Sequence, residues 1–66
     1  MNVIINGEEK SFEAPLNLQQ CLEQEGFADM TVAVARNNAF VPKGEYENTT
    51  LEDGDALDIV APFQGG

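Results

Sequence analysis

The sequence predicts an α+β domain in which one main helix packs across a mixed sheet of four to five strands. Three observations support this prediction. Short stretches with the alternating apolar residues of strands lie both before and after one stretch of helical period. Turn-forming pairs such as Asn6-Gly7 separate neighbouring strands. Strands on both sides of a single long helix are typical of a sheet with one covered face.

The chain opens with a predicted hairpin. Residues 1–5 form the first strand, with the odd-numbered side chains expected inward. Asn6-Gly7 follows directly, and this pair is the strongest short-range signal for a hairpin turn. We expect the returning strand at 10–13, with Phe12 directed inward.

The predicted helix runs from Leu18 to Glu25. Asn17 suits the N-cap position, and Gln20 three residues later forms a variant of the capping box. Gly26 is placed for a left-handed C-cap. The apolar stripe of the helix consists of Leu18, Cys21 and Leu22.

Two short strands are predicted next, at 31–36 and 39–41. Asn37-Asn38 turns the chain between them, since Asn tolerates the left-handed region. In the first of these strands we expect Val32 and Val34 to point inward.

The last strand is predicted at 56–61. A helical turn at 43–47, anchored by Tyr46, comes before it, and Asp53-Gly54-Asp55 forms a tight acidic turn directly ahead of it. Alternation predicts Leu57 and Ile59 on one face of this strand, and Asp58 and Val60 on the other.

The first and last strands are both strongly apolar, so we place them side by side and parallel in the sheet centre. That order is the β-grasp arrangement. Residues 1–61 are expected to form a single β-grasp domain, and residues 62–66 a flexible tail that ends in Gly65-Gly66. When extended, this tail spans roughly 16 Å, which is enough to thread the active-site channel of another protein.

Composition limits the possible functions. One cysteine and no histidine leave no disulfide within the chain and make a structural zinc site unexpected. Twelve acidic and three basic residues give a formal net charge of -9. Nucleic acid and anionic membranes attract clustered Lys and Arg, so this charge argues against both and favours a partner with a basic surface. We find no leader-like or membrane-length apolar run and expect a cytoplasmic protein.

Several side chains have a functional and a plain structural interpretation. We expect Cys21 to be a packing residue rather than a reactive thiol. Phe40 and Tyr46 are interpreted as packing residues of the core or of a satellite cluster, with partner contact as the less favoured alternative. The carboxylates of Asp53, Asp55 and Asp58 do not match a calcium loop, so a solvated turn and no metal site are expected.

Six features follow one another along the chain in a characteristic order. They are the Asn6-Gly7 turn, the helical Leu18…Glu23 segment, Val32–Asn37, Phe40–Pro42, Leu51–Ile59 and the final Gly65-Gly66. In this order and spacing almost the whole chain resembles the sulfur carrier protein of thiamine biosynthesis, the ThiS family of ubiquitin-like β-grasp proteins. The segment 57–66 is also similar to the end of ubiquitin.

The resemblance implies a carrier rather than an enzyme, whose functional group is the Gly66 carboxylate. A ubiquitin-activating-like adenylyltransferase, using ATP and Mg, would adenylate that carboxylate. A cysteine desulfurase or similar sulfur donor would then supply the sulfur of a thiocarboxylate, and thiazole synthase would accept it. Val60, Phe63, Gln64 and Gly65 are the expected partner-binding residues, and no bound cofactor is expected.

Other functions remain open from the sequence. Pro62-Phe63-Gln64 resembles the approach to the terminus in the molybdenum cofactor carrier, the small subunit of molybdopterin synthase. Carriers for cysteine or methionine synthesis share these features too. Outside sulfur transfer, the alternatives are a ubiquitin-like protein modifier and a passive interaction module. An enzyme acting alone is least expected, because no nucleophile–base pair is visible.

Overall fold

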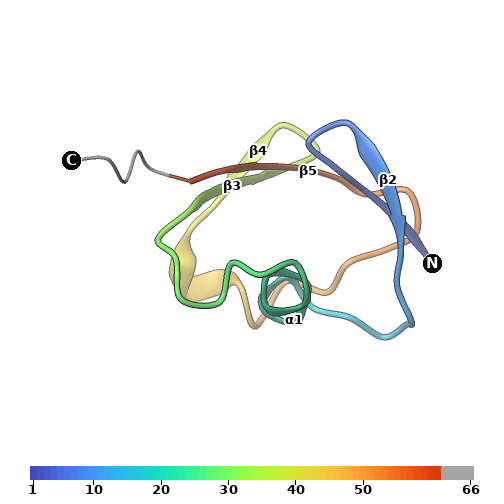
Figure 1. The fold of residues 1–66 in the computed structure, drawn as a ribbon, viewed down its shortest axis with the longest axis horizontal. Coiled ribbons are helices and arrows are strands. Elements are labelled where there is room, and N and C mark those ends of the chain that lie inside the picture. Colours follow the sequence, from blue (N-terminus) through green and yellow to red (C-terminus); the bar gives the residue numbers. More distant parts are fainter. Residues whose placement is uncertain (62–66) are drawn as a thin grey trace.

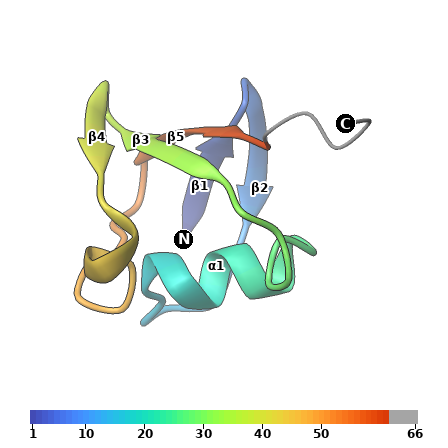
Figure 2. The same ribbon diagram turned by 90° about the vertical axis from the view of Figure 1, so that its left-hand side faces the viewer.

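The computed structural model describes residues 1–61, which form a five-stranded sheet with one α-helix across one face (Figures 1 and 2). The strands are β1 (Asn2–Ile5), β2 (Glu8–Ser11), β3 (Ala33–Arg36), β4 (Ala39–Val41) and β5 (Ala56–Val60). The helix α1 spans Leu18–Gln24, and a 3₁₀ turn, η1, spans Lys43–Glu45. The strand order is β2-β1-β5-β3-β4. The predicted α+β, β-grasp fold is confirmed.

The first and last strands pair in the middle of the sheet. β1 and β5 are parallel, with Ile4 opposite Ala56 and Ile5 opposite Leu57. β5 is antiparallel to β3 on its other side, so it is the central strand of the five. This central, parallel placement agrees with the expectation drawn from the apolar character of both strands.

The first hairpin turns at Asn6-Gly7, as predicted. Both residues have positive φ, 52° and 86°, which is the conformation of a two-residue turn of type I′. Because the turn has only two residues, Ile5 already faces Glu8 and β2 begins there. The expected strand at 10–13 is therefore wrong by two positions, and Phe12 follows the strand, although it is buried as expected.

Both ends of α1 are closed by the residues that the sequence indicated. The Asn17 side chain accepts a hydrogen bond from the amide of Gln20 at 2.7 Å, and the Gln20 side chain accepts one from the amide of Asn17 at 2.9 Å. At the other end Gly26 has a φ of +89°, and the amide of Phe27 donates to the carbonyl of Leu22 at 2.8 Å. These bonds satisfy backbone groups that a helix end leaves unpaired.

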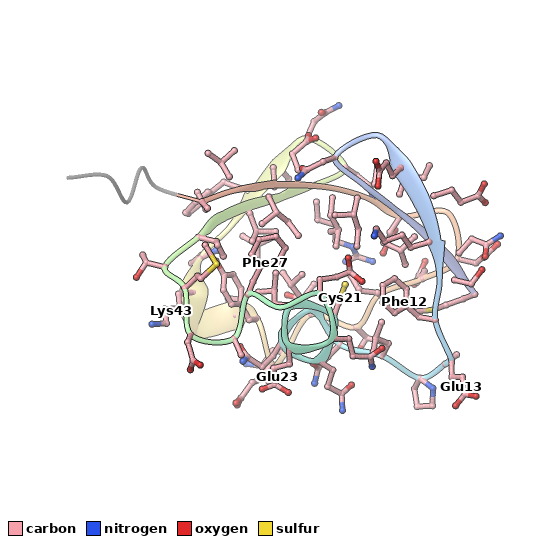
Figure 3. All side chains as sticks on the ribbon, viewed as in Figure 1. Phe12, Glu13, Cys21, Glu23, Phe27 and Lys43 are labelled. Carbon is pink, nitrogen blue, oxygen red and sulfur yellow. The ribbon has the colours of Figure 1, made fainter. Side chains whose placement is uncertain are left out.

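The core lies between α1 and the sheet. Its most deeply buried side chains are Val3, Leu18, Cys21, Val34 and Leu57. Figure 3 shows Phe12, Cys21 and Phe27 in the space between α1 and the strands, whereas Glu23 points away from it. The alternation in β5 is as predicted, with Leu57 and Ile59 inward and Asp58 and Val60 outward.

Five elements are shorter than the sequence suggested. β1 begins at Asn2 rather than at residue 1, and α1 ends at Gln24 rather than at Glu25. β3 begins at Ala33 rather than at residue 31, because its partner β5 ends at Val60, directly opposite. β5 likewise ends one residue before the expected limit. The turn predicted at 43–47 is the shorter η1, and Tyr46 anchors it as expected by donating from Oη to the carbonyl of Val32 at 3.1 Å. Within residues 1–61 no helix has the length and apolar character needed to cross a membrane.

Candidate functional site

One face of the sheet packs on α1, and within residues 1–61 no element covers the opposite face (Figures 1 and 2). Alternate positions of β1, β3, β4 and β5 point out of this second face. We call it the open sheet face. Its central side chains are Ile4, Ala33, Ala35, Phe40, Ala56, Asp58 and Val60, and Asn2, Glu9 and Ser11 lie toward the β2 edge. An exposed apolar surface of this kind is typical of an interaction site.

The register of the strands determines which side chains are neighbours on the open sheet face. Ala35 lies between Phe40 on β4 and Asp58 on β5, and Ala33 lies opposite Val60. Phe40 and Val60 are large apolar side chains that are 71% and 63% exposed. Two exposed large apolar side chains thus stand next to the small side chains of Ala33 and Ala35.

The packing role expected for Phe40 is wrong. Asn37 and Asn38 both have positive φ, 51° and 70°, and form a two-residue turn. This turn sets Ala39 opposite Arg36, and Phe40 one residue later shares the outward face of its partner on β3. Counting two residues from the Asn-Asn turn and applying strand alternation would have placed Phe40 outward from the sequence alone.

Among the expected partner-binding residues, Val60 lies on the open sheet face and is exposed. Its role in binding stays a prediction. Phe63, Gln64, Gly65 and Gly66 lie outside the described residues. Phe40, for which partner contact was the less favoured interpretation, belongs to the same surface. Ile4, which is 37% exposed, lies there too and was not proposed as a contact residue from the sequence.

Acidic side chains border the apolar part of the open sheet face. Asp58 lies on the face itself, and Glu9 on β2 stands opposite Ile4 at its edge. Both carboxylates belong to exposed residues. Together with the net charge of -9, they make the surface complementary to a basic partner and favour rapid encounter with it.

Asp55 is not the solvated turn residue that we expected, because only 6% of its surface is exposed. Its carboxylate accepts hydrogen bonds from Arg36 Nε at 2.9 Å, Asn37 Nδ2 at 3.1 Å and the amide of Glu52 at 2.8 Å, and Arg36 Nη2 lies 2.8 Å away. Burial alone would raise the pKa of Asp55, but these hydrogen bonds and the Arg36 charge together hold it below its usual range. The network joins the β3–β4 turn to the loop that leads into β5.

The structure places no three carboxylate, thiol or imidazole groups of residues 1–61 together in a metal site.

Cys21 lies in the core with no exposed surface. Burial, and to a smaller degree the negative charge of Glu25, raise the pKa of its thiol to about 11. The thiolate is the reactive form of cysteine. This buried position confirms the prediction that Cys21 is a packing residue.

We expect the native protein to react with a thiol reagent such as Ellman's reagent at least about a hundredfold more slowly than the urea-unfolded chain at pH 8, since both the raised pKa and burial suppress attack. Absorbance at a series of urea concentrations measures both rates. A native rate within a few-fold of the unfolded rate would contradict this assignment.

Comparison with known proteins extends over nearly all of the chain. The sequence model of the ThiS family matches residues 3–66. The crystal structure of a thiamine biosynthesis protein (ThiS) from Geobacter metallireducens is similar with a TM-score of 0.83 and 28% sequence identity, and the match covers 100% of both chains.

Two longer proteins contain a similar segment. The chain is 42% identical over 66 residues to a thiazole synthase from Paramagnetospirillum magneticum and 38% identical to one from Magnetococcus marinus. All 66 residues match in each case, but the chain spans only 20% of the length of these relatives.

Proposed function

This chain belongs to the ThiS family of sulfur carriers, and on that premise we propose that the carboxylate of Gly66 is the group that carries the sulfur. The observation that supports this most is the extent of the family match, which runs to residue 66 and so includes Gly65-Gly66. The central strand β5 ends only six positions before Gly66. The sheet thereby fixes the start of the segment that leads to the reacting group.

The chemistry needs an activating partner, because a carboxylate is a poor electrophile. A ubiquitin-activating-like adenylyltransferase joins the Gly66 carboxylate to AMP from MgATP and releases pyrophosphate. The outer sulfur of a persulfide made by a cysteine desulfurase or a similar donor then attacks the acyl-adenylate and displaces AMP. A thiol reductant cleaves the S–S bond of the resulting acyl disulfide and leaves a thiocarboxylate. The chain itself supplies the carboxylate and the surface by which each partner binds.

Thiazole synthase is the acceptor that the relatives favour. Two proteins of that name include a segment similar to this whole chain. A segment that is joined to an enzyme in one organism is a natural partner of that enzyme when the two are separate. In this proposal the thiocarboxylate delivers its sulfur to thiazole synthase for formation of the thiazole ring.

The open sheet face is the docking surface in this proposal. Val60, with Phe40 and Ile4, contacts the partner, while Phe63, Gln64 and Gly65 bind along the path to its active site. Glycines near the reacting group let two backbones approach closely, where a Cβ would clash.

The mass of the intact protein tests the proposal. We would incubate the chain with host extract, ATP and cysteine, and then map any change to the terminal peptide. Mapping is needed because replacement of oxygen by sulfur adds nearly the same mass as one oxidation, and the thioethers of Met1 and Met30 can be oxidised. ATP-dependent sulfur at Gly66 is the expected result. Isopeptide adducts on other proteins would indicate a modifier, and an unmodified terminus beside a competent activating enzyme would favour a passive interaction module.

Substitution of Val60 by Asp is expected to weaken binding of the adenylyltransferase by about tenfold or more, as for a central interface residue, with only a small change in melting midpoint. The side chain is 63% exposed and contributes little to the core. Calorimetric titration and thermal unfolding measure the two effects.

Met30→Asp is the matched control, since Met30 is also a partly exposed apolar residue, at 39%, but lies in the segment between α1 and β3. Equal loss of affinity in both variants, or a fall in melting midpoint that parallels the loss of affinity, would contradict the assignment of this surface.

A further inference from the structure

The side chain of Asn6 continues the pairing of β1 with β5 beyond the end of β1. The backbone ladder ends where the Asn6 amide donates to the carbonyl of Leu57 at 2.9 Å. At this residue the chain enters its left-handed turn and reverses into β2. The backbone of β1 therefore cannot reach Ile59, the next residue of β5 whose backbone groups face this side.

The Asn6 carboxamide takes the place of the missing strand residue. Its Oδ1 accepts a hydrogen bond from the amide of Ile59 at 2.8 Å, and its Nδ2 donates one to the carbonyl of Ile59 at 3.1 Å. A carboxamide offers the same donor and acceptor as a peptide unit, so both backbone groups of Ile59 are paired. Aspartate lacks the donor, and glutamine is one methylene longer.

The location of this contact gives it a consequence beyond stability. Ile59 is the penultimate residue of β5, and on the other side the same stretch pairs with β3 through Val34 and Ala33. The end of β5 is thus held from both sides. With the carboxamide gone, only the β3 side would hold it, and the direction in which the chain leaves the sheet would vary.

We propose that Asn6 is a positioning residue for the reaction at Gly66: its carboxamide fixes the end of β5 and thereby the point on the sheet from which the chain continues toward the activating enzyme. This inference rests on the proposed function. The Asn6 carboxamide is engaged by the backbone of Ile59, so the expected effect is on the geometry of the bound chain rather than on docking.

Asn6→Gly tests the proposal, because a Gly-Gly turn keeps both positive-φ positions and removes only the carboxamide. Asn6→Asp keeps the acceptor and turns the donor into a second carboxylate oxygen against the Ile59 carbonyl. Asn38→Gly is the matched control: Asn38 also has positive φ, in the second hairpin turn, and its side chain makes none of the hydrogen bonds found within residues 1–61.

The first readout is hydrogen exchange of single amides by NMR. In Asn6→Gly the Ile59 amide is expected to exchange about tenfold or more faster relative to the core amides of Leu22 and Val34, because its hydrogen-bond acceptor is lost. Asn6→Asp keeps that acceptor, so its Ile59 amide should exchange more slowly than in Asn6→Gly. Asn38→Gly should leave that ratio unchanged. A uniform increase over all core amides would overturn the proposal, since it would mean that Asn6 contributes only to global stability.

The second readout is ATP–pyrophosphate exchange by the ubiquitin-activating-like adenylyltransferase, measured over a range of chain concentrations well below the unfolding temperature. We expect a several-fold lower kcat for both Asn6 variants with KM close to that of the unaltered chain. Equal kcat, or a change in KM alone, would overturn the positioning role. The two proposals can fail separately. If the unaltered chain supports no ATP–pyrophosphate exchange, the proposed function fails. Faster hydrogen exchange of the Ile59 amide alone in Asn6→Gly would still show that the Asn6 carboxamide holds the end of β5.

Discussion

Removal of Gly66 is expected to abolish ATP-dependent sulfur loading while the melting midpoint stays unchanged. The shortened chain still ends in a carboxylate, but that carboxylate is one residue, about 3.3 Å, short of the position that the proposed activating site requires. Stability should not change, because the core draws its residues from Val3 to Ile59. Loading is measured by mass spectrometry of the terminal peptide, and stability by thermal unfolding.

Gly66→Ala keeps the length of the chain and adds only a Cβ. It therefore distinguishes the effect of a shorter chain from the effect of steric hindrance at the last residue. We expect loss of loading here too, since a Cβ beside the reacting carboxylate hinders close approach of the activating enzyme's backbone. Glu47→Ala is the control: Glu47 is exposed, follows η1 and is remote in sequence from both β5 and Gly66. Near-normal loading of either Gly66 variant would refute the assignment of the terminal carboxylate.

Substitution of Asp55 by Ala or Asn is expected to lower the free energy of unfolding by about 2–4 kcal/mol. Ala leaves the Arg36 guanidinium and the Glu52 amide without their acceptor, and Asn removes the negative charge and replaces one acceptor oxygen by an NH2 donor. Arg36 is itself mostly covered. A domain of this size has about 3–10 kcal/mol in total, so the loss is a large part of it. Urea unfolding at pH 7 measures the effect. Glu47→Gln, which removes an exposed carboxylate, should change stability little, and an equal loss in that variant would show that general charge effects rather than the network are responsible.

The same network predicts a pH dependence. The pKa of Asp55 is lower in the folded chain than its ordinary value of 3.8, so the unfolded chain takes up the proton first as pH falls. The stabilisation is therefore fully present above the ordinary pKa and is lost as the pH falls through the lower pKa of the folded state. The difference in urea midpoint between the unaltered chain and Asp55→Asn should be large at pH 7 and shrink steadily below pH 3.8. A constant difference over that range would contradict the role of the carboxylate charge.

The sequence predicted those parts of the fold that depend on neighbouring residues. Asn17 and Gln20 close the start of α1, and the Asn6-Gly7 turn forms, because caps and tight turns need only a few consecutive residues. The central pair β1 and β5 was also predictable, since strands with buried alternation and the strongest apolar character belong in the middle of a sheet.

The errors arose where an outcome depends on register or on distant partners. Phe40 faces solvent because the length of the turn before it fixes its side of β4. Asp55 is buried because Arg36, 19 positions earlier, lies beside it in the fold. The turn role of Asn6 was clear from its neighbour Gly7, but its bonds to Ile59 join residues 53 positions apart, and no local pattern indicates them.

The pairing of β1 with β5 also determines how the domain can fold. The hairpins β1–β2 and β3–β4 are local and can form early, but an isolated hairpin is only marginally stable in water. β5 lies between these two hairpins in the sheet and is the last strand of the chain. Its pairing with β1 closes a loop that spans most of the chain, and this closure costs conformational entropy before the contacts form. Folding is therefore expected to be slower than in a helical bundle of equal length, and strongly cooperative. No partly folded intermediate can hold β5 in place, so the end of β5 is fixed only in a completely folded chain.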